Sequence, residues 1–259
     1  RVGVQVRPQH TTVPSMREAW KRSEDAGVDT LWTWDHFFPT NGDPQGNHFE
    51  CWTLLGAMAV ATERVEFGAM VTAIGYRNPA LLSDMAKTID HLSGGRLILG
   101  LGAGWKVRDY EEFGYPMPDA PARLRELRRG IEIIKERWTI DVPPPLRNPI
   151  PILIGGGGEK VTLRITAQHA QIWNMVGRPE VFAAKNRILD EHCRAIGRDP
   201  GEIERSVNVE VEDTYDPAVL DAFAEAGGTH IILRFQDPWD FTAIDNLVAW
   251  RDQRRAAQG

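Results

Sequence analysis

Short apolar runs alternate with longer amphipathic segments along the whole chain, and this alternation limits the folds that the chain can adopt. Eight runs rich in β-branched and aliphatic residues predict strands, and a segment with helical periodicity follows each of them. The predicted strands cover residues 2–6, 30–34, 65–71, 96–101, 151–154, 171–174, 203–211 and 229–234. The predicted helices cover residues 14–26, 50–62, 79–92, 122–138, 159–168, 179–196, 217–226 and 241–257.

Strands that alternate with helices pair in parallel through right-handed crossovers. Eight such units within 259 residues predict an α/β fold in which a single (β/α)8 TIM barrel domain covers residues 1–259. An open, doubly wound sheet is the alternative, because a count of units does not show closure. The proline-rich segment 141–151 leads directly into a predicted strand, so we interpret it as a loop within one domain.

The composition is that of an ordinary globular protein, with 42% hydrophobic and 25% charged residues. The formal net charge of −6 argues against a nucleic-acid partner, because a phosphate-binding face makes a domain basic. The sequence has no apolar run of membrane-spanning length, and its two cysteines are too few for a disulfide framework. We therefore expect a cytoplasmic protein that acts on a small molecule and has no membrane partner.

Functional residues of a (β/α)8 barrel lie where its strands end, at the C-terminal face. The second predicted strand ends in "LWTWDHFF", which presents Asp35 and His36 side by side. An imidazole group exchanges protons near neutral pH, so His36 is the candidate catalytic acid or base. Asp35 would orient it or bind a ligand. The alternative is a histidine that only makes a structural hydrogen bond at the end of a strand.

Two glycine-rich segments, "LGLGAGW" and "LIGGGGEK", also follow predicted strands. The second opens directly onto a predicted helix, and the free N–H groups at a helix start favour an anion. We therefore predict a phosphate site at Gly156, Gly157 and Gly158, although four glycines could also simply turn a corner. Neither segment has the spacing of GxxxxGK[ST] or of GxGxxG, so we predict neither a P-loop nor a dinucleotide fingerprint.

Metal binding and aromatic pocket walls are the remaining site candidates. His10, His36, His48 and Asp35 form the one early group of metal-ligand residue types, but they lack HxH or HExxH spacing, so we predict no metal site. Trp105 follows the first glycine segment and would suit the wall of a pocket for a flat ring. Ordinary core packing is the alternative for the aromatic residues.

Four stretches of the sequence resemble the luciferase-like monooxygenase superfamily over nearly the whole chain. They are "WTWDHFFP", "GAMVTAIGYRNPALLSDMAKTIDHLSGGRLILGLGAGW", "EEFGYPMP" and "PILIGGGGEKVTLRITAQHAQIWN". They are most similar to the actinobacterial branch of coenzyme F420 (deazaflavin)-dependent oxidoreductases. Enzymes that use flavin mononucleotide (FMN) share much of this pattern, so the resemblance is less specific for the cofactor than for the fold.

The resemblance implies a (β/α)8 barrel with the deazaflavin ring at its C-terminal mouth and His36 as the acid or base beside the hydride-accepting carbon. It implies a non-proline cis peptide bond on the third strand, between Ala69 and Met70. Relatives in this family are often homodimers. The implied cofactor-binding residues are Asp35, Ala69, Met70, Thr72, Gly102, Ala103, Gly104, Gly156, Gly157 and Gly158.

The chain departs from the sugar-phosphate dehydrogenases of this family at the expected substrate pocket. Those relatives have glutamates where this chain has Gln9 and Trp105, and a tryptophan where it has Thr40. We assign Gln9 and Trp105 to the substrate pocket, and we do not expect glucose 6-phosphate to be the substrate. The segment 139–150 is shorter than in relatives, which predicts a more open pocket.

Three functions are compatible with the sequence. The first is an F420-dependent oxidoreductase that transfers a hydride between the deazaflavin and a small organic substrate, in either direction. The second is an FMN-dependent luciferase-like monooxygenase. The third is a barrel that binds a flavin or deazaflavin without turnover, against which Asp35 and His36 at the mouth argue.

Overall fold

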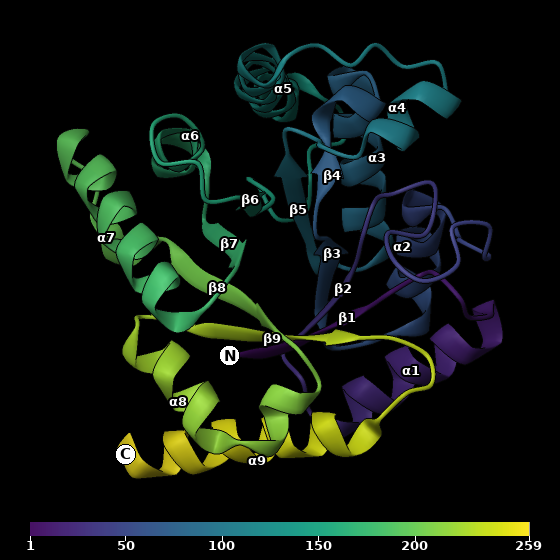
Figure 1. The fold of residues 1–259 in the computed structure, drawn as a ribbon. Helices are drawn as coiled ribbons and strands as arrows, with labels where there is room; N and C mark the ends of the chain where they lie inside the picture. The colour runs from purple at the N-terminus through teal and green to yellow at the C-terminus, as the bar shows by residue number, and fades with distance from the viewer. Residues whose placement is uncertain (259) are drawn as a thin grey trace.

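The computed structural model describes residues 1–258, and these form a closed barrel of parallel strands surrounded by helices (Figure 1). The predicted (β/α)8 barrel is thereby confirmed. In the described part of the chain the strands are β1 (Val2–Val6), β2 (Thr30–Thr33), β3 (Glu66–Ala69), β4 (Thr72–Ala73), β5 (Leu97–Gly102), β6 (Ile152–Gly155), β7 (Ile172–Val176), β8 (Glu204–Val209) and β9 (His230–Phe235).

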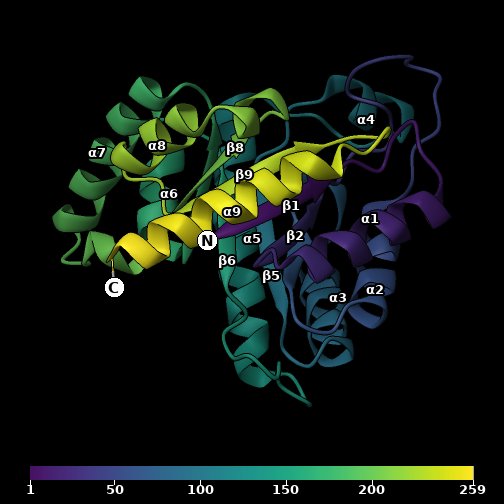
Figure 2. The ribbon, with the colours of Figure 1, turned by 90° about the horizontal axis from the view of Figure 1, so that it is seen from below.

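The α-helices form the outer layer, and Figure 2 shows α9 crossing beneath β1 and β9. The described α-helices are α1 (Val13–Ala26), α2 (Cys51–Ala61), α3 (Pro79–Leu92), α4 (Val107–Glu112), α5 (Ala120–Ile140), α6 (Thr162–His169), α7 (Pro179–Ala195), α8 (Pro217–Glu225) and α9 (Phe241–Gln258). None of these helices combines the length and the apolar character that a membrane crossing requires.

The third predicted strand, residues 65–71, is shorter in the structure, because β3 ends at Ala69 and β4 lies beyond the predicted range. β3 pairs with both β2 and β5, and β4 continues the ladder along β5 after a bulge at Met70 and Val71. The non-proline cis peptide bond joins Met70 to Val71, so the predicted position between Ala69 and Met70 is wrong by one residue. The reason is that the pairing between β2 and β3 continues one residue further than we expected. Ala69 lies opposite Thr33, and the Met70 N–H donates to the Thr33 carbonyl oxygen (2.7 Å).

Strand residues alternate between the helix-facing core and the barrel interior. Outward side chains such as Val4, Leu31 and Leu99 pack against the helices. Inward side chains form a separate small apolar core, made of Trp32, Met70, Ile98, Leu153, Ile172 and Ile232. Because the strand period is two, the next inward residue of each strand faces the C-terminal mouth.

Helix boundaries follow local capping chemistry. Asn78 caps α3 by accepting backbone hydrogen bonds at its first turn, and Gly27 ends α1 in the left-handed region at φ 97°. The predicted helix 159–168 begins later, because residues 159–161 form a turn and α6 starts at Thr162 without a side-chain cap. The glycine segment therefore does not open directly onto a helix.

The short segment 139–150 lies at the opposite end of the barrel from the mouth. It contacts the C-terminal end of α3, where the His91 imidazole bonds the Pro144 carbonyl oxygen (2.8 Å) and the Asp90 carboxylate accepts from the Arg147 N–H (3.1 Å). A connection from a helix to the next strand runs along this N-terminal end. The expectation that a shorter segment opens the pocket is therefore wrong.

Candidate functional site

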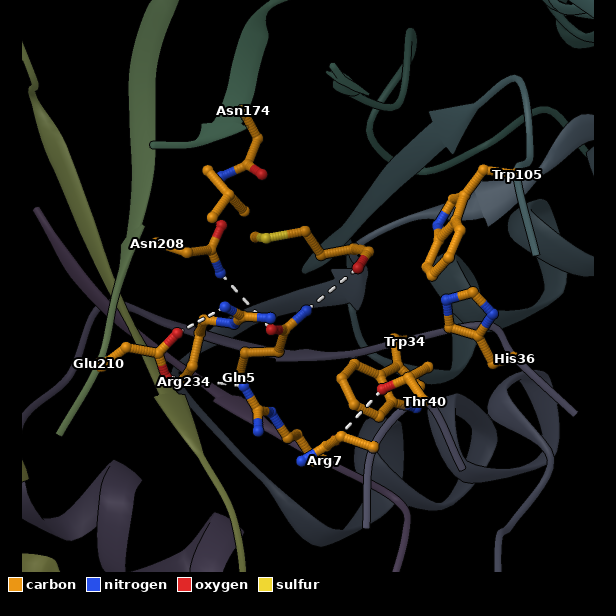
Figure 3. Close-up of a pocket in the computed structure, with 13 residues that line it drawn as sticks. Gln5, Arg7, Trp34, His36, Thr40, Trp105, Asn174, Asn208, Glu210 and Arg234 are labelled. Carbon is orange, nitrogen blue, oxygen red and sulfur yellow. Dashed lines mark hydrogen bonds and ion pairs between the residues drawn. The ribbon is translucent and has the colours of Figure 1, made fainter. Parts of the chain in front are cut away.

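A cavity of about 600 Å³, here called the mouth cavity, opens at the C-terminal ends of the strands (Figure 3). Its lining comes from the inward residues above the apolar core and from the segment that follows β2. The lining residues are Gln5, Arg7, Trp34, His36, Thr40, Asn41, Met70, Trp105, Asn174, Val176, Asn208, Glu210 and Arg234. A polar interior above an apolar layer is the arrangement of a barrel that binds a small ligand.

His36 stands on one side of the mouth cavity and is fixed by a buried carboxylate. Its Nδ1 lies 2.6 Å from Asp109 Oδ2, and the Asp109 side chain is fully buried. The same carboxylate accepts from Tyr76 Oη (2.8 Å) and from the Phe37 N–H (3.3 Å). A carboxylate partner fixes Nδ1 as the donor, so Nε2 is the nitrogen left to exchange a proton with a ligand.

The electrostatics of Asp109 support this arrangement. Burial opposes the charged form, but the hydrogen bonds and charge of His36, with those of Tyr76 and Phe37, lower the pKa of the Asp109 carboxyl group from its usual value. Burial and the Asp109 charge raise the pKa of Tyr76, which stays a neutral donor. At neutral pH the site therefore contains an ionised Asp109 that supports a proton donor at His36 Nδ1.

Sequence reasoning missed Asp109, because it lies on α4, a short helix that periodicity did not reveal. One signal was available in the sequence. Asp109 follows Trp105 by four residues, and Trp105 was itself a predicted pocket residue. A carboxylate that near a predicted site could have been tested as a partner for His36.

Two indole rings enclose the His36 imidazole. The rings of Trp34 and Trp105 meet it edge-on, with centroids at 5.8 and 5.6 Å. Trp34 donates through Nε1 to His48 Nε2 (3.0 Å), and burial followed by repulsion from His36 lowers the pKa of His48 to about 4. His48 is therefore neutral at pH 7 and serves as an acceptor that fixes Trp34. The indoles limit the access of water to the imidazole.

Asp35 does not reach the mouth cavity and is fully buried in an ion pair. Its carboxylate contacts Arg77 at 2.5 and 3.2 Å, and Arg77 also binds Glu50 at 2.6 Å. Burial raises the pKa of the Asp35 carboxyl group, and Arg77 opposes that shift. Asp35 instead lines a second cavity of about 130 Å³, here called the side cavity, which shares His36, Met70 and Trp105 with the mouth cavity.

The glycines of the first segment accommodate the bulge between β3 and β4. A Cβ atom at Gly100 would overlap the Ala69 carbonyl oxygen, and one at Gly102 would lie 2.6 Å from Val71 Cγ2. Gly104 has a φ of +78°, and a Cβ there would overlap the Tyr110 hydroxyl group. Close approach of neighbouring chain segments is therefore sufficient to explain these glycines, whether or not a ligand binds here.

The second glycine segment connects the bulge to the outer surface. A Cβ at Gly155 would lie 3.0 Å from Val71 Cγ1, so this segment starts beside the bulge. The Gly156 N–H donates to the Asn174 carbonyl oxygen (2.9 Å), while those of Gly157 and Gly158 have no partner within residues 1–258. These two N–H groups are the ones that remain able to bind an anion.

A groove of about 800 Å³ between α5 and α6 continues from this segment, and we call it the basic groove. It is lined by Ala120, Pro121, Leu124, Arg125, Arg128, Arg129, Glu132, Lys160, Val161, Arg164, Ile165 and Gln168. Five of these side chains are cationic and one is acidic. Of the cations, only Arg128 has an ion-pair partner within the described chain, Glu132 at 3.4 Å.

Other predicted site residues have structural partners. Gln9, which we expected in the substrate pocket, lines neither cavity; its side chain is buried and bonds Asn41 and the Thr40 N–H. Thr72 is buried and accepts from Trp52 Nε1 (3.0 Å). Ala69 lies within β3, whereas Met70 and Trp105 do line the mouth cavity. Ala103 is half-buried at the end of β5.

No group of three or more His, Cys, Asp or Glu side chains in the described residues is placed to hold a metal ion.

Comparisons with known proteins agree with the fold. The profile of the family described as "Luciferase-like monooxygenase" matches residues 1–222. An F420-dependent glucose-6-phosphate dehydrogenase from Amycolatopsis mediterranei is 33% identical over 158 residues, which are 54% of this chain and 46% of the relative. The match thus spans about half of that enzyme's length.

Two further relatives match over more of the chain. An uncharacterized protein from Mycobacterium tuberculosis is 26% identical over 253 residues, covering 89% of this chain and 81% of the relative. An FMNH(2)-dependent dimethylsulfone monooxygenase from Pseudomonas putida is 26% identical over 248 residues, covering 82% and 67%.

Among solved structures, an F420-dependent secondary alcohol dehydrogenase in complex with an F420-acetone adduct superposes with a TM-score of 0.84. The two chains are 18% identical, and the alignment covers 96% of this chain and 97% of the other. At that identity the likeness shows a shared fold.

Proposed function

The chain belongs to the luciferase-like monooxygenase family, and we propose that it is a coenzyme F420-dependent oxidoreductase that transfers a hydride between the deazaflavin and a small organic substrate. One observation carries the proposal: the buried Asp109 carboxylate holds His36 at the wall of the mouth cavity, beside the bulge at Met70 and Val71. This places a proton-exchanging group next to a surface on which a flat ring can lie. The relatives named as F420-dependent support the same cofactor.

The residues around the bulge fit a cofactor with a ring and a phosphate. Met70 and Val71 would support the ring, and both line the side cavity. The phosphate would bind the N–H groups of Gly157 and Gly158, which have no other partner in the part of the chain described. A Cβ atom at Gly158 would lie 2.7 Å from Thr162 Oγ1, so a residue larger than glycine would crowd the proposed phosphate site.

The cofactor, when bound, supplies the hydride chemistry, and the protein supplies position and a proton. His36 holds a proton at Nε2 and gives it to the substrate during reduction, or accepts one during oxidation. Asp109 keeps the ring oriented, with Nδ1 as the nitrogen that donates to its carboxylate. Trp34 and Trp105 restrict water around the imidazole.

The basic groove favours the deazaflavin over FMN. The resemblance implies that the deazaflavin carries an acidic tail beyond its phosphate, and FMN ends at its phosphate. The groove begins beside the glycine segment and has a net charge of +4 from five cationic side chains and one acidic side chain. Lys160 and Arg164 both line it, close in sequence to the glycine segment. Exposed cations attract such a tail over several ångströms.

We expect the double variant Lys160→Glu/Arg164→Glu to weaken deazaflavin binding by about tenfold at low salt, because it replaces attraction by repulsion along the tail. Binding of FMN should change much less, because FMN has no tail to reach the groove. Fluorescence titration with each cofactor measures both effects. Arg194→Glu on α7 is the matched control, because Arg194 is exposed and lies outside the groove. An equal loss for both cofactors would contradict a tail-binding role.

The proposal as a whole is tested by titrating the apoprotein separately with the deazaflavin and with FMN and following cofactor fluorescence. We expect tight binding of the deazaflavin. Preference for FMN would favour the monooxygenase alternative, which the Pseudomonas relative represents. Tight binding with no turnover of any enone, imine or alcohol would favour the non-catalytic alternative.

Asp109→Asn should lower kcat by about tenfold or more without a matching loss of cofactor affinity. The substitution keeps the shape of the side chain, but an amide can present its NH₂ group to Nδ1 and favour the wrong tautomer. Steady-state kinetics and fluorescence titration of the cofactor measure the two quantities. An unchanged kcat would contradict a role for Asp109 in orienting His36.

A further inference from the structure

We propose that the substrate carries a carboxylate group, which binds to Arg234 on the side of the mouth cavity opposite His36 and to Arg7 beside Trp34. This inference rests on the proposed function for the reaction, and it adds the chemical class of the substrate. Figure 3 shows the two sides: His36 and Trp105 stand on one, and Glu210 and Arg234 stand on the other.

The strand register brings the two arginines together. Inward residues of β1 continue from Gln5 to Arg7, and Gln5 lies directly opposite Arg234 on β9. Glu210 follows β8 and bridges them, with Arg234 Nη1 at 2.5 Å from its Oε1 and Arg7 Nη2 at 3.7 Å from its Oε2. Three neighbouring strand ends therefore form one charged wall.

The charges of this wall do not cancel. Two guanidinium groups face one carboxylate, which leaves a net charge of +1, and arginine stays protonated inside proteins. Burial and repulsion from Arg234 lower the pKa of Arg7, as two like charges held close together require. A monoanion would bring the net charge of the wall to zero, whereas a dianionic phosphate would leave it at −1. The charge balance thus favours a carboxylate over a phosphate.

Arg7 also has unused hydrogen-bonding capacity. Its side chain is only 11% exposed and lies 5.4 Å from the centre of the Trp34 ring. Nη1 donates to Gln236 Oε1 (3.1 Å), but the buried Nε has no partner among residues 1–258. Arg7 lines the mouth cavity, and a guanidinium group that is not fully paired is suited to bind a carboxylate there. Asn174 and Asn208 line the Arg234 side of the cavity and supply neutral polar contacts.

The test compares cinnamate with cinnamamide, which have the same shape and the same C=C bond but differ in charge. Isothermal titration calorimetry of the protein, with and without bound deazaflavin, measures both ligands. We expect cinnamate to bind at least tenfold more tightly. Arg234→Gln and Arg7→Gln should each weaken cinnamate binding by about 10–100-fold, as expected when a charge-assisted hydrogen bond is lost, and leave cinnamamide nearly unchanged.

Arg194→Gln is the control for a general loss of positive charge, because Arg194 is exposed on α7. Arg7→Lys tests geometry as well as charge, and Arg234, which is more exposed than Arg7, decides the question if Arg7→Gln does not fold. Equal binding of the two ligands would overturn the inference, as would tighter binding of phenyl phosphate than of cinnamate. The apoprotein titration decides it even if the deazaflavin fails to bind, so the two proposals fail separately.

Discussion

His36→Ala should lower kcat by about 10²–10⁴-fold while the protein still binds its cofactor, which is the range that one positioned acid or base contributes. We propose the imidazole as the proton-exchanging group of the mouth cavity, and it has Asp109 on Nδ1 and two indole rings beside it. Removing it leaves the bulge at Met70 and Val71 and the glycine segment intact. Steady-state kinetics and fluorescence titration on the same preparation measure the two quantities.

His36→Gln is the companion variant, because it keeps a polar side chain but cannot carry the proton. We expect it to be as inactive as His36→Ala. Unchanged turnover in both variants would remove His36 from the mechanism. A parallel loss of turnover and cofactor affinity would instead show that His36 mainly shapes the cofactor site.

Gly100→Ala should destabilise the protein by about 3 kcal/mol, at the upper end of the range for overpacking a rigid core. The new Cβ would overlap the backbone carbonyl oxygen of Ala69, and backbone held in a closed barrel cannot rotate away as a side chain can. The midpoint of thermal unfolding should fall by roughly 6–12 °C, given the slope typical of a chain of this size. Cofactor binding should weaken too, because relief of the overlap moves the bulge.

Gly56→Ala is the matched control for this substitution. Gly56 lies within α2, and a Cβ there would have no other atom within 4 Å. Alanine is favoured over glycine inside a helix, so this variant should gain about 0.5–1 kcal/mol. If Gly100→Ala also raised the free energy of unfolding, the close approach of β3 to β5 would not restrict the residue at position 100.

Most of the barrel could be predicted from periodicity, because each strand and each helix has its own local pattern. The eight predicted units correspond to the barrel, and β4 is the one strand that was not predicted separately. β4 is two residues long and pairs only after the bulge, so no local pattern marks it. The delayed start of α6 escaped prediction for a related reason: a turn after four glycines leaves little signal.

The site was predicted less completely than the barrel, because pairing between distant side chains is invisible in a single sequence. His36 was found from its place at the end of β2. Its partner Asp109 lies 73 positions away, and Arg77 and Asp35 pair across 42 positions. The charged wall could not be predicted without the strand register, because Arg7 and Arg234 come together only when β1 lies beside β9.

The contact between β3 and β5 also has a consequence for how this barrel can change over generations. Gly100 and Gly102 leave room for Ala69 and Val71, so the two strands form a matched pair. A larger residue at Gly100 becomes tolerable only in a chain whose third strand runs without the bulge. Loss of the bulge, which we propose supports the cofactor ring, and recovery of side chains on β5 should therefore occur together, and a descendant without the bulge would be free to fill both glycine positions.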